Sequence, residues 1–328
     1  MNLSLYKGWR STLPWIISGC LLAYVFGWAT DWERLSQATQ DANLPLFLAF
    51  VTADRLAFFV IWTWLWAAAL RRIVAHVPVH SVFAIRGGSE LARAVSNPLS
   101  DAAFFLGLVQ LARGRIEAVV ASALVPVVGH FVVMLMQMTI ATPFLEGGIA
   151  GNPGVAGAVG VLWALVAAGA VGVWLFRTGR ISYRGAAPIA AWMDRFPPRE
   201  LAIFLWGFAA LAVFDIHIQW LASSAFGVPI DWTALAARIP LVYLSFSIPT
   251  LGNFGTRELA WAHLFSDFGP RDALIAYAFA VNAIFFVLNV VIGVVFLPRA
   301  LELISAVRRA RREGEAVPRP LLHDPTDQ

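Results

Sequence analysis

The sequence contains few charged residues, one cysteine and one lysine. Charged residues make up 13% of its 328 positions, whereas a soluble domain of this size carries roughly 25%. Cys20 is the single cysteine, so an intramolecular disulfide is excluded. No group of histidine, cysteine or acidic residues has the spacing of metal ligands, and no nucleotide-binding or nucleophile-elbow motif occurs. We therefore predict no metal, no cofactor and no catalytic residues of a recognisable type.

Long apolar runs take the place of these features. Hydrophobic residues make up 59% of the sequence, and many runs reach the roughly 20 residues that a helix needs to cross a hydrocarbon core. The predicted fold class is all-α, a polytopic helical membrane protein with broken or re-entrant segments. We predict about eight transmembrane helices, over residues 13–30, 44–70, 117–141, 154–177, 200–226, 233–250, 255–268 and 272–298. A short apolar segment at 98–111 is predicted to be a re-entrant or interfacial helix.

The basic residues predict the topology. Most of the 24 lysines and arginines lie in segments assigned to one side of the membrane, and only Arg34 and Arg271 lie in the opposite loops. This bias predicts a bacterial inner-membrane protein with cytoplasmic N- and C-termini. It also explains the basic excess without nucleic acid, so the predicted partner is the lipid bilayer. We divide the chain into a transmembrane domain, 1–306, and a disordered basic cytoplasmic tail, 307–328.

Two similar stretches occur in the two halves of the sequence. The first, GSELARA, begins at Gly88, and the second, GTRELAWA, begins at Gly255. Each lies near a proline and precedes a short apolar helix. Interrupted helices at matching places of two halves point to the binding site of a transporter, so we predict a candidate inverted repeat; a chance match of helix-forming residues is the alternative. The residues of the first-half motif are Gly88, Ser89, Glu90 and Arg93.

The stretch from Ile248 to Leu259 contains the strongest predicted helix break. Pro249 cannot donate a helical hydrogen bond, and Gly252, Asn253 and Gly255 can take left-handed conformations. A break at membrane depth is costly unless its backbone is buried in protein or lines a cavity. We therefore predict that one helix ends before this stretch and that a short helix begins after it.

The start of this short helix is predicted to bind an anion. Thr256 is a natural N-cap, and a helix N-terminus offers unpaired N–H groups and positive potential. Arg257 adds a planar, bidentate donor that suits phosphate. Glu258 stabilises the same terminus, or it pairs with Arg257 or Arg238. The alternative is that Thr256 and Glu258 only cap the helix and that Arg257 is their salt-bridge partner.

Adjacent charges occur within the second predicted span. Asp54 and Arg55 diverge by about 100° on a helix, so we expect them to contact different neighbours. Asp54 is predicted to neutralise an arginine, and Arg55 to meet Asp215 or Glu258. A ligand role for either residue is the alternative.

Two later spans carry further polar residues. Asp215 and Gln219 share a helix face at i and i+4. A carboxylate at mid-bilayer is paired or neutral, so Asp215 is a candidate proton-coupled site or a counter-ion for Arg238, which could instead snorkel outward. Asn282 and Asn289 share a stripe of the last span, where they form interhelical hydrogen bonds or line a cavity.

The stretch Pro249–Leu259, followed by apolar residues, Gly269 and a last long span, resembles the signature of the lysylphosphatidylglycerol synthase transmembrane region, the flippase-like domain family. Residues 255–258 fit its Gly-x-Arg-Glu motif position by position, and residues 88–90 with Arg93 resemble its first-half Gly-Glu-x-x-Arg element. The turn is poorer in glycine than is usual in the family, and an Arg-Asp pair of the first half is missing. The soluble aminoacyl-transferase domain of the full synthases is absent, so the resemblance does not imply lipid aminoacylation.

The resemblance implies a protein that binds an anionic or carrier-linked lipid and flips it between leaflets. The residues implied to hold the lipid phosphate are Gly255, Thr256 and Arg257, with Arg55 or Arg238. Glu258 and Asp215 would be counter-charges or proton-coupled groups. The alternative is a membrane-embedded enzyme or accessory subunit acting on lipid-linked substrates of envelope lipid or glycolipid biosynthesis, with a membrane or peripheral biosynthetic partner. A third hypothesis is a scaffold that recruits a soluble partner through the basic tail.

Overall fold

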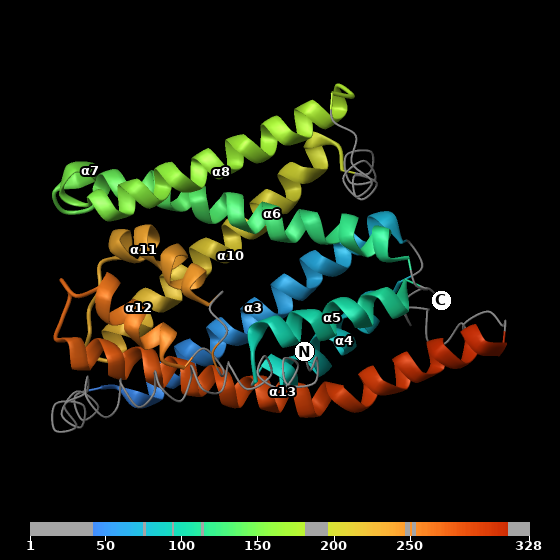
Figure 1. Cartoon of the computed structure of the whole chain (residues 1–328). Coiled ribbons are helices and arrows are strands. Elements are labelled where there is room, and N and C mark those ends of the chain that lie inside the picture. The colour runs from blue at the N-terminus through green and yellow to red at the C-terminus, as the bar shows by residue number, and fades with distance from the viewer. Residues whose placement is uncertain are drawn as a thin grey trace, which may run out of the picture. The chain divides into compact units, whose positions relative to one another are not determined.

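The computed structural model describes residues 42–74, 77–93, 95–112, 115–180, 196–246, 250 and 254–313. Within these ranges every regular element is a helix, as the sequence predicts. Figure 1 shows these helices coloured along the chain. The predicted first span, 13–30, and the end of the predicted tail, 314–328, lie outside the described residues.

Eleven helices follow one another within the described ranges. They are α3 (Leu44–Ile73), α4 (Val79–Arg93), α5 (Asn97–Leu111), α6 (Ile116–Ala141), η1 (Thr142–Phe144), α7 (Gly148–Gly151), α8 (Pro153–Arg177), α10 (Pro198–Ala225), α11 (Trp232–Ser245), α12 (Thr256–Leu264) and α13 (Arg271–Glu313).

Five of the described helices are long and apolar enough to cross a membrane, namely α3, α6 with η1, α8, α10 and α13. Their bounds agree closely with five predicted spans, except at the C-terminal end of α13, because a run of about 20 apolar residues is a signal that the local sequence carries by itself. The predicted count of about eight spans is not reached in the described part of the chain. There α11 has 14 residues and α12 has 9, so each is shorter than a crossing helix.

The structure differs from the prediction at α4 and at the end of α13. None of the predicted spans covers Val79–Arg93, where the structure has the continuous helix α4. α13 continues through Glu313, so residues 307–313 of the predicted tail are helical. α5 begins at Asn97 and matches the predicted short helix at 98–111.

The chain divides into two compact units whose boundaries lie within helices. Unit 1 comprises the residues up to Ala57, Gly87–Phe104 and Asp215–Pro298, and unit 2 comprises Phe58–Arg86, Phe105–Phe214 and the residues from Arg299 onward. All candidate site residues of the sequence analysis belong to unit 1.

An aromatic cluster forms the core of unit 1. Tyr277 of α13 is fully buried, and its ring centre lies 5.9, 5.6 and 4.9 Å from those of Phe47, Phe226 and Trp261. These tilted and edge-on contacts are the favoured geometries of aromatic pairs. The rings come from α3, the turn after α10, and α12, and α12 packs against α11. The cluster therefore joins the helices that carry the candidate site.

The core of unit 2 lies between α3, α6 and α10. It includes the buried side chains of Leu65, Val125 and Phe208, and α6 packs along α8 (Figure 1). Large apolar side chains such as Ile140 and Trp206 are exposed, and the most apolar stretch of α8 has no buried residue within unit 2. Such extensive exposed apolar surface is compatible with contact to lipid.

In unit 1, α13 and α4 approach each other very closely at Gly293. A Cβ atom at this position would lie 2.6 Å from the backbone nitrogen of Leu91 in α4 and 2.7 Å from its Cβ. Real Cβ atoms do not come that close, so the absence of a side chain allows the approach. Gly172 of α8 offers a contrast, because a Cβ there would have no neighbour within 4 Å.

We predict that Gly293→Ala destabilises the protein, whereas the matched substitution Gly172→Ala does not. The added methyl group at residue 293 forces α4 and α13 apart, which costs about 1–3 kcal/mol in a well-packed interior. The same group at residue 172 meets open space. The thermal midpoint of the detergent-purified protein, followed by size-exclusion chromatography, should fall for Gly293→Ala only. Equal midpoints for the two variants would contradict the close approach of α4 and α13.

Candidate functional site

The helix break predicted before Gly255 is present. α11 ends at Ser245 and α12 begins at Thr256. Gly255 has a φ of 87°, a left-handed value that side chains disfavour. Its N–H donates a hydrogen bond of 2.6 Å to Oε2 of Glu258, which is the carboxylate half of a capping box. Glycine has no side chain for the other half, so the cap rests on Glu258.

The prediction that Thr256 is the N-cap is wrong. Gly255 occupies that position, and its left-handed conformation makes Thr256 the first helical residue. The hydroxyl of Thr256 lies 3.2 Å from the hydroxyl of Thr250, which ties together the two sides of the break. The predicted turn residues Pro249, Gly252 and Asn253 lie outside the described residues.

Arg257, the second residue of α12, is buried with only 2% of its surface exposed. Its guanidinium carbon lies 4.9 Å from the ring centre of Phe285 and 5.3 Å from that of Phe246, so both rings attract the cation. No ion pair among the described residues includes Arg257, and its Nε has no hydrogen-bond partner among them. Because arginine stays charged, Arg257 is a buried cation that makes no ion-pair contact within the described ranges.

Two aspartates lie near this cation. Asp54 of α3 and Asp215 of α10 are each 4% exposed. Gln219, one helical turn after Asp215 in α10, donates a hydrogen bond to Asp54, so the two carboxyl groups lie beside each other, and Arg257 is near both. Oδ1 of each aspartate has no hydrogen-bond partner among the described residues.

One glutamine and two tyrosines complete this arrangement. Gln219 donates to Oδ2 of Asp54 at 3.3 Å, and the hydroxyl of Tyr243 donates to Oδ2 of Asp215 at 2.6 Å. The hydroxyl of Tyr277 donates to Oε1 of Gln219 at 2.8 Å. We name the Asp–Arg cluster by its members, Asp54, Asp215, Gln219, Tyr243, Arg257 and Tyr277.

Glu258 is fully buried, and its two carboxylate oxygens have different partners. Oε2 accepts the N–H of Gly255, and Oε1 accepts a hydrogen bond of 3.5 Å from Nδ2 of Asn282 in α13. Glu258 was predicted either to stabilise the helix N-terminus or to pair with an arginine. The hydrogen bond from Gly255 matches the first alternative. Asn282 makes the interhelical hydrogen bond that its position in the last span predicts.

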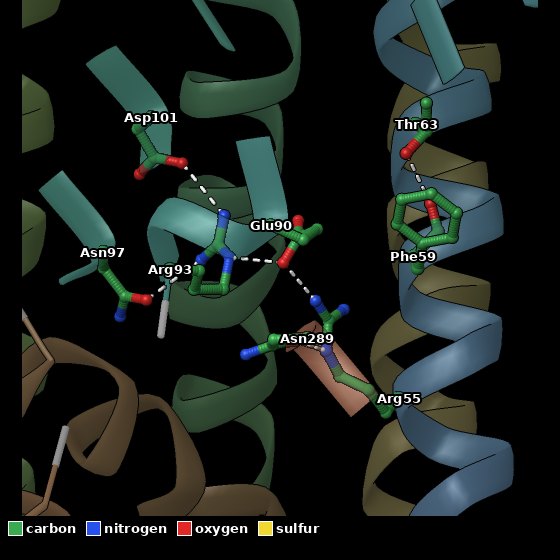
Figure 2. Close-up of polar contacts among 8 residues, drawn as sticks. All are labelled: Arg55, Phe59, Thr63, Glu90, Arg93, Asn97, Asp101 and Asn289. Atoms are coloured by element: carbon green, nitrogen blue, oxygen red, sulfur yellow. Dashed lines mark hydrogen bonds and ion pairs between the residues drawn. The ribbon is translucent and has the colours of Figure 1, made fainter. Parts of the chain in front are cut away.

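A second polar network surrounds Glu90, as Figure 2 shows. Glu90 of α4 is fully buried, and its Oε2 forms ion pairs with Arg55 of α3 and with Nε of Arg93, the latter at 2.7 Å. Arg55 also donates from Nε to Oδ1 of Asn289 in α13 at 2.6 Å. One carboxylate thus holds two guanidinium groups, and the contacts connect α3, α4 and α13.

Arg93 extends this network to α5. Its Nη1 donates to Asn97 and its Nη2 to Asp101, each at 3.1 Å. Together with the bond to Glu90, every guanidinium nitrogen of Arg93 donates a hydrogen bond. We name the Glu90 network by its members, Arg55, Glu90, Arg93, Asn97, Asp101 and Asn289.

The structure corrects the predicted partners of Arg55. Its carboxylate partner is Glu90, and not Asp215 or Glu258, because α4 meets α3 at the level of Arg55. The prediction that Asp54 and Arg55 contact different neighbours is confirmed, since Asp54 faces α10.

The structure also corrects the predicted partners of Arg238. Its Nη1 lies 2.5 Å from Oδ1 of Asp267 and donates to the carbonyl oxygen of Leu264 at 2.7 Å. These contacts tie Arg238 to the C-terminal end of α12, about 10 Å along the helix from Arg257. The predicted pairing of Arg238 with Asp215 is wrong, and the two arginines do not converge on one point.

The first-half motif adopts a different local structure from the second. Gly88 and Ser89 are buried inside α4, so the chain does not break at GSELARA. The interruption follows the motif, between Arg93 and Asn97. Glu90 therefore forms ion pairs with arginine side chains, whereas Glu258 caps a helix N-terminus.

The sequence analysis missed the aromatic members of the site. Tyr243 and Tyr277 carried a usable signal, because the chain has only 5 tyrosines and a hydroxyl within an apolar helix usually finds a partner. Phe246 and Phe285 carried none, since they are two of 24 phenylalanines.

Comparison with models of known protein families, with curated protein sequences and with solved structures found no match for this chain. In the described ranges, no group of three histidine, cysteine or acidic side chains is arranged to hold a metal ion. The site itself offers a buried guanidinium, two neighbouring carboxyl groups and neutral hydrogen-bonding side chains.

We predict that Glu90→Gln lowers the stability by about 3–5 kcal/mol, because it leaves two guanidinium groups without their shared carboxylate. Arg299→Gln removes an exposed pair with Glu302 and should cost less than about 1 kcal/mol. Thermal midpoints in detergent measure both effects. In addition, the loss of stability in the double variant Arg55→Gln/Glu90→Gln should be smaller than the sum of the losses in the two single variants. Strictly additive losses would contradict the pairing.

Proposed function

We propose that this protein is an integral protein of the bacterial inner membrane that binds an anionic or carrier-linked lipid by its phosphate and moves it between leaflets. The observation that carries the proposal is the buried guanidinium of Arg257, whose Nε has no hydrogen-bond partner among the described residues. A permanent charge in an apolar interior is stabilised by an anion. The guanidinium fork matches the geometry of phosphate oxygens.

The surroundings of Arg257 support a phosphate ligand. The residue lies in the first turn of α12, where the helix dipole favours negative charge. Glu258, the adjacent carboxylate, accepts hydrogen bonds from the N–H of Gly255 and from Asn282. It forms no ion pair with Arg257 in the described part of the chain. The rings of Phe246 and Phe285 border the guanidinium and are compatible with a ligand that is also partly apolar.

The apolar helices support a lipid over a soluble anion. Five helices are long and apolar enough to cross a membrane, and a lipid can reach a site among such helices while its acyl chains stay in an apolar phase. The resemblance of residues 255–258 to the flippase-like motif favours the same substrate class. In this proposal both termini are cytoplasmic. Arg55 and Arg238 have structural roles: Arg55 connects the helices of the Glu90 network, and Arg238 stabilises the C-terminal end of α12.

We predict that Arg257→Gln weakens the binding of phosphatidylglycerol by about 10- to 100-fold, the equivalent of about 1.5–3 kcal/mol for a hydrogen bond to a charged group. Arg271→Gln is the matched control, because it removes the same charge at the exposed start of α13. Binding is measured on the purified protein with a short-chain phosphatidylglycerol, and folding by size-exclusion chromatography. Unchanged binding by a folded Arg257→Gln variant would remove Arg257 as the site.

Translocation is tested in liposomes that contain fluorescent phosphatidylglycerol. Dithionite destroys the fluorescence of the outer leaflet only, so leaflet exchange makes the protected fraction fall. The wild-type protein should exchange the lipid faster than protein-free liposomes do, and Arg257→Gln should not. Binding without exchange, together with a chemically altered lipid detected by mass spectrometry, would favour the membrane-embedded enzyme.

A further inference from the structure

We propose that Asp54 and Asp215 form a proton-binding pair that is linked to the anion at Arg257. The pair holds one proton when no anion is bound, and it takes up a second proton when an anion binds. This inference rests on the proposed function, since it assumes that Arg257 is the anion site. It adds the co-substrate of that site, a proton, and the direction of the coupling, which is uptake with the anion.

The contact between the two carboxyl groups is the first step. Asp54 and Asp215 are both buried, and Gln219, one helical turn after Asp215, donates to Asp54, so the two carboxyl groups lie beside each other. Two full negative charges in contact repel strongly where the dielectric constant is low, and a hydrogen bond between carboxyl groups needs one proton. The pair therefore carries one negative charge, which balances the positive charge of Arg257.

The other groups that face the pair leave this balance unchanged. On α3, Arg55 is paired with Glu90. On α12, Glu258 accepts the N–H of Gly255 at the positive end of the helix, which offsets its charge. The side chains that α10, α11 and α13 present to the pair are neutral, namely Gln219, Tyr243 and Tyr277.

Anion binding changes the balance in one direction only. A phosphodiester at Arg257 brings one negative charge and neutralises the guanidinium, so the charge of the pair loses its partner. A proton from solvent then forms one O–H bond with a carboxylate oxygen and leaves two neutral carboxyl groups. Oδ1 of Asp54 and Oδ1 of Asp215 have no hydrogen-bond partner among the described residues, so each is available to receive that proton. Because linkage is reciprocal, protons and anions then strengthen each other's binding.

The experiment measures proton uptake during binding of a short-chain phosphatidylglycerol to the full-length protein. Its phosphodiester keeps a constant charge, so a pH dependence reports on the protein. Isothermal titration calorimetry in buffers of different ionisation enthalpy gives the number of protons taken up per bound lipid. For the wild type we expect one proton per lipid and an affinity that rises about tenfold for each pH unit of acidification.

The variants separate the pair from other carboxylates. Asp54→Asn/Asp215→Asn should bind the lipid with no proton uptake and with pH-independent affinity. Asp215→Asn alone keeps one carboxylate beside Arg257 and should still take up one proton. Asp231→Asn changes an exposed carboxylate at the start of α11 and should behave as the wild type.

The possible results distinguish the two proposals. Wild-type binding that is independent of pH and takes up no proton would overturn the coupling and leave the anion site standing. Proton uptake by the double variant that equals the wild-type value would overturn the assignment to Asp54 and Asp215. Absence of binding at every pH, or wild-type binding by Arg257→Gln, would overturn both proposals. If this double variant does not fold, Asp54→Ser/Asp215→Ser replaces it, and the same results support or overturn the assignment.

Discussion

Compensation of charges buried among apolar helices is the constraint on which unit 1 depends. An uncompensated ion in such a place costs several kcal/mol, and Glu90 removes this cost for Arg55 and Arg93 at once. The resulting contacts determine the register of α3 against α4 and α13, because a shift by one helical turn, about 5.4 Å, would separate them. The same register directs Asp54, the neighbour of Arg55, toward α10. Placement of the Asp–Arg cluster therefore follows from the Glu90 network.

The break between α11 and α12 allows Arg238 and Arg257 to face different partners. In one continuous helix, the positions of Arg238 and Arg257 would be related by the helical period alone. The left-handed Gly255 restarts the helix, and Glu258 compensates the new terminus from within the chain. Arg257 can then interact with the aspartates while Arg238 holds the other end of α12. Irregular backbone among apolar helices is tolerated where protein surrounds it, and the buried contact between Thr250 and Thr256 fits that condition.

Apolar length was enough to predict α3, α6, α8, α10 and α13, since each is specified by its own residues. The break before α12 was predicted for the same reason, because glycine and proline act locally. Partners were not predictable in this way. The pair Arg55–Glu90 joins residues whose approach depends on the packing of α3 against α4, and the sequence offered Asp215 and Glu258 as equally reasonable acceptors. α4 was missed because a helix with buried charges lacks the apolar run of a span, and its charges are acceptable only when their partners are known.

The two polar groups of unit 1 differ in how their guanidinium groups are bonded. In the Glu90 network, every guanidinium nitrogen of Arg93 donates a hydrogen bond. Because all three guanidinium nitrogens of Arg93 bond to side chains of α4 and α5, these bonds hold the two helices together. In the Asp–Arg cluster, Nε of Arg257 and Oδ1 of both aspartates have no hydrogen-bond partner within the described ranges. Unused donors and acceptors lower stability when buried, and the proposed function would use both: the donor for an anion and the acceptors for a proton.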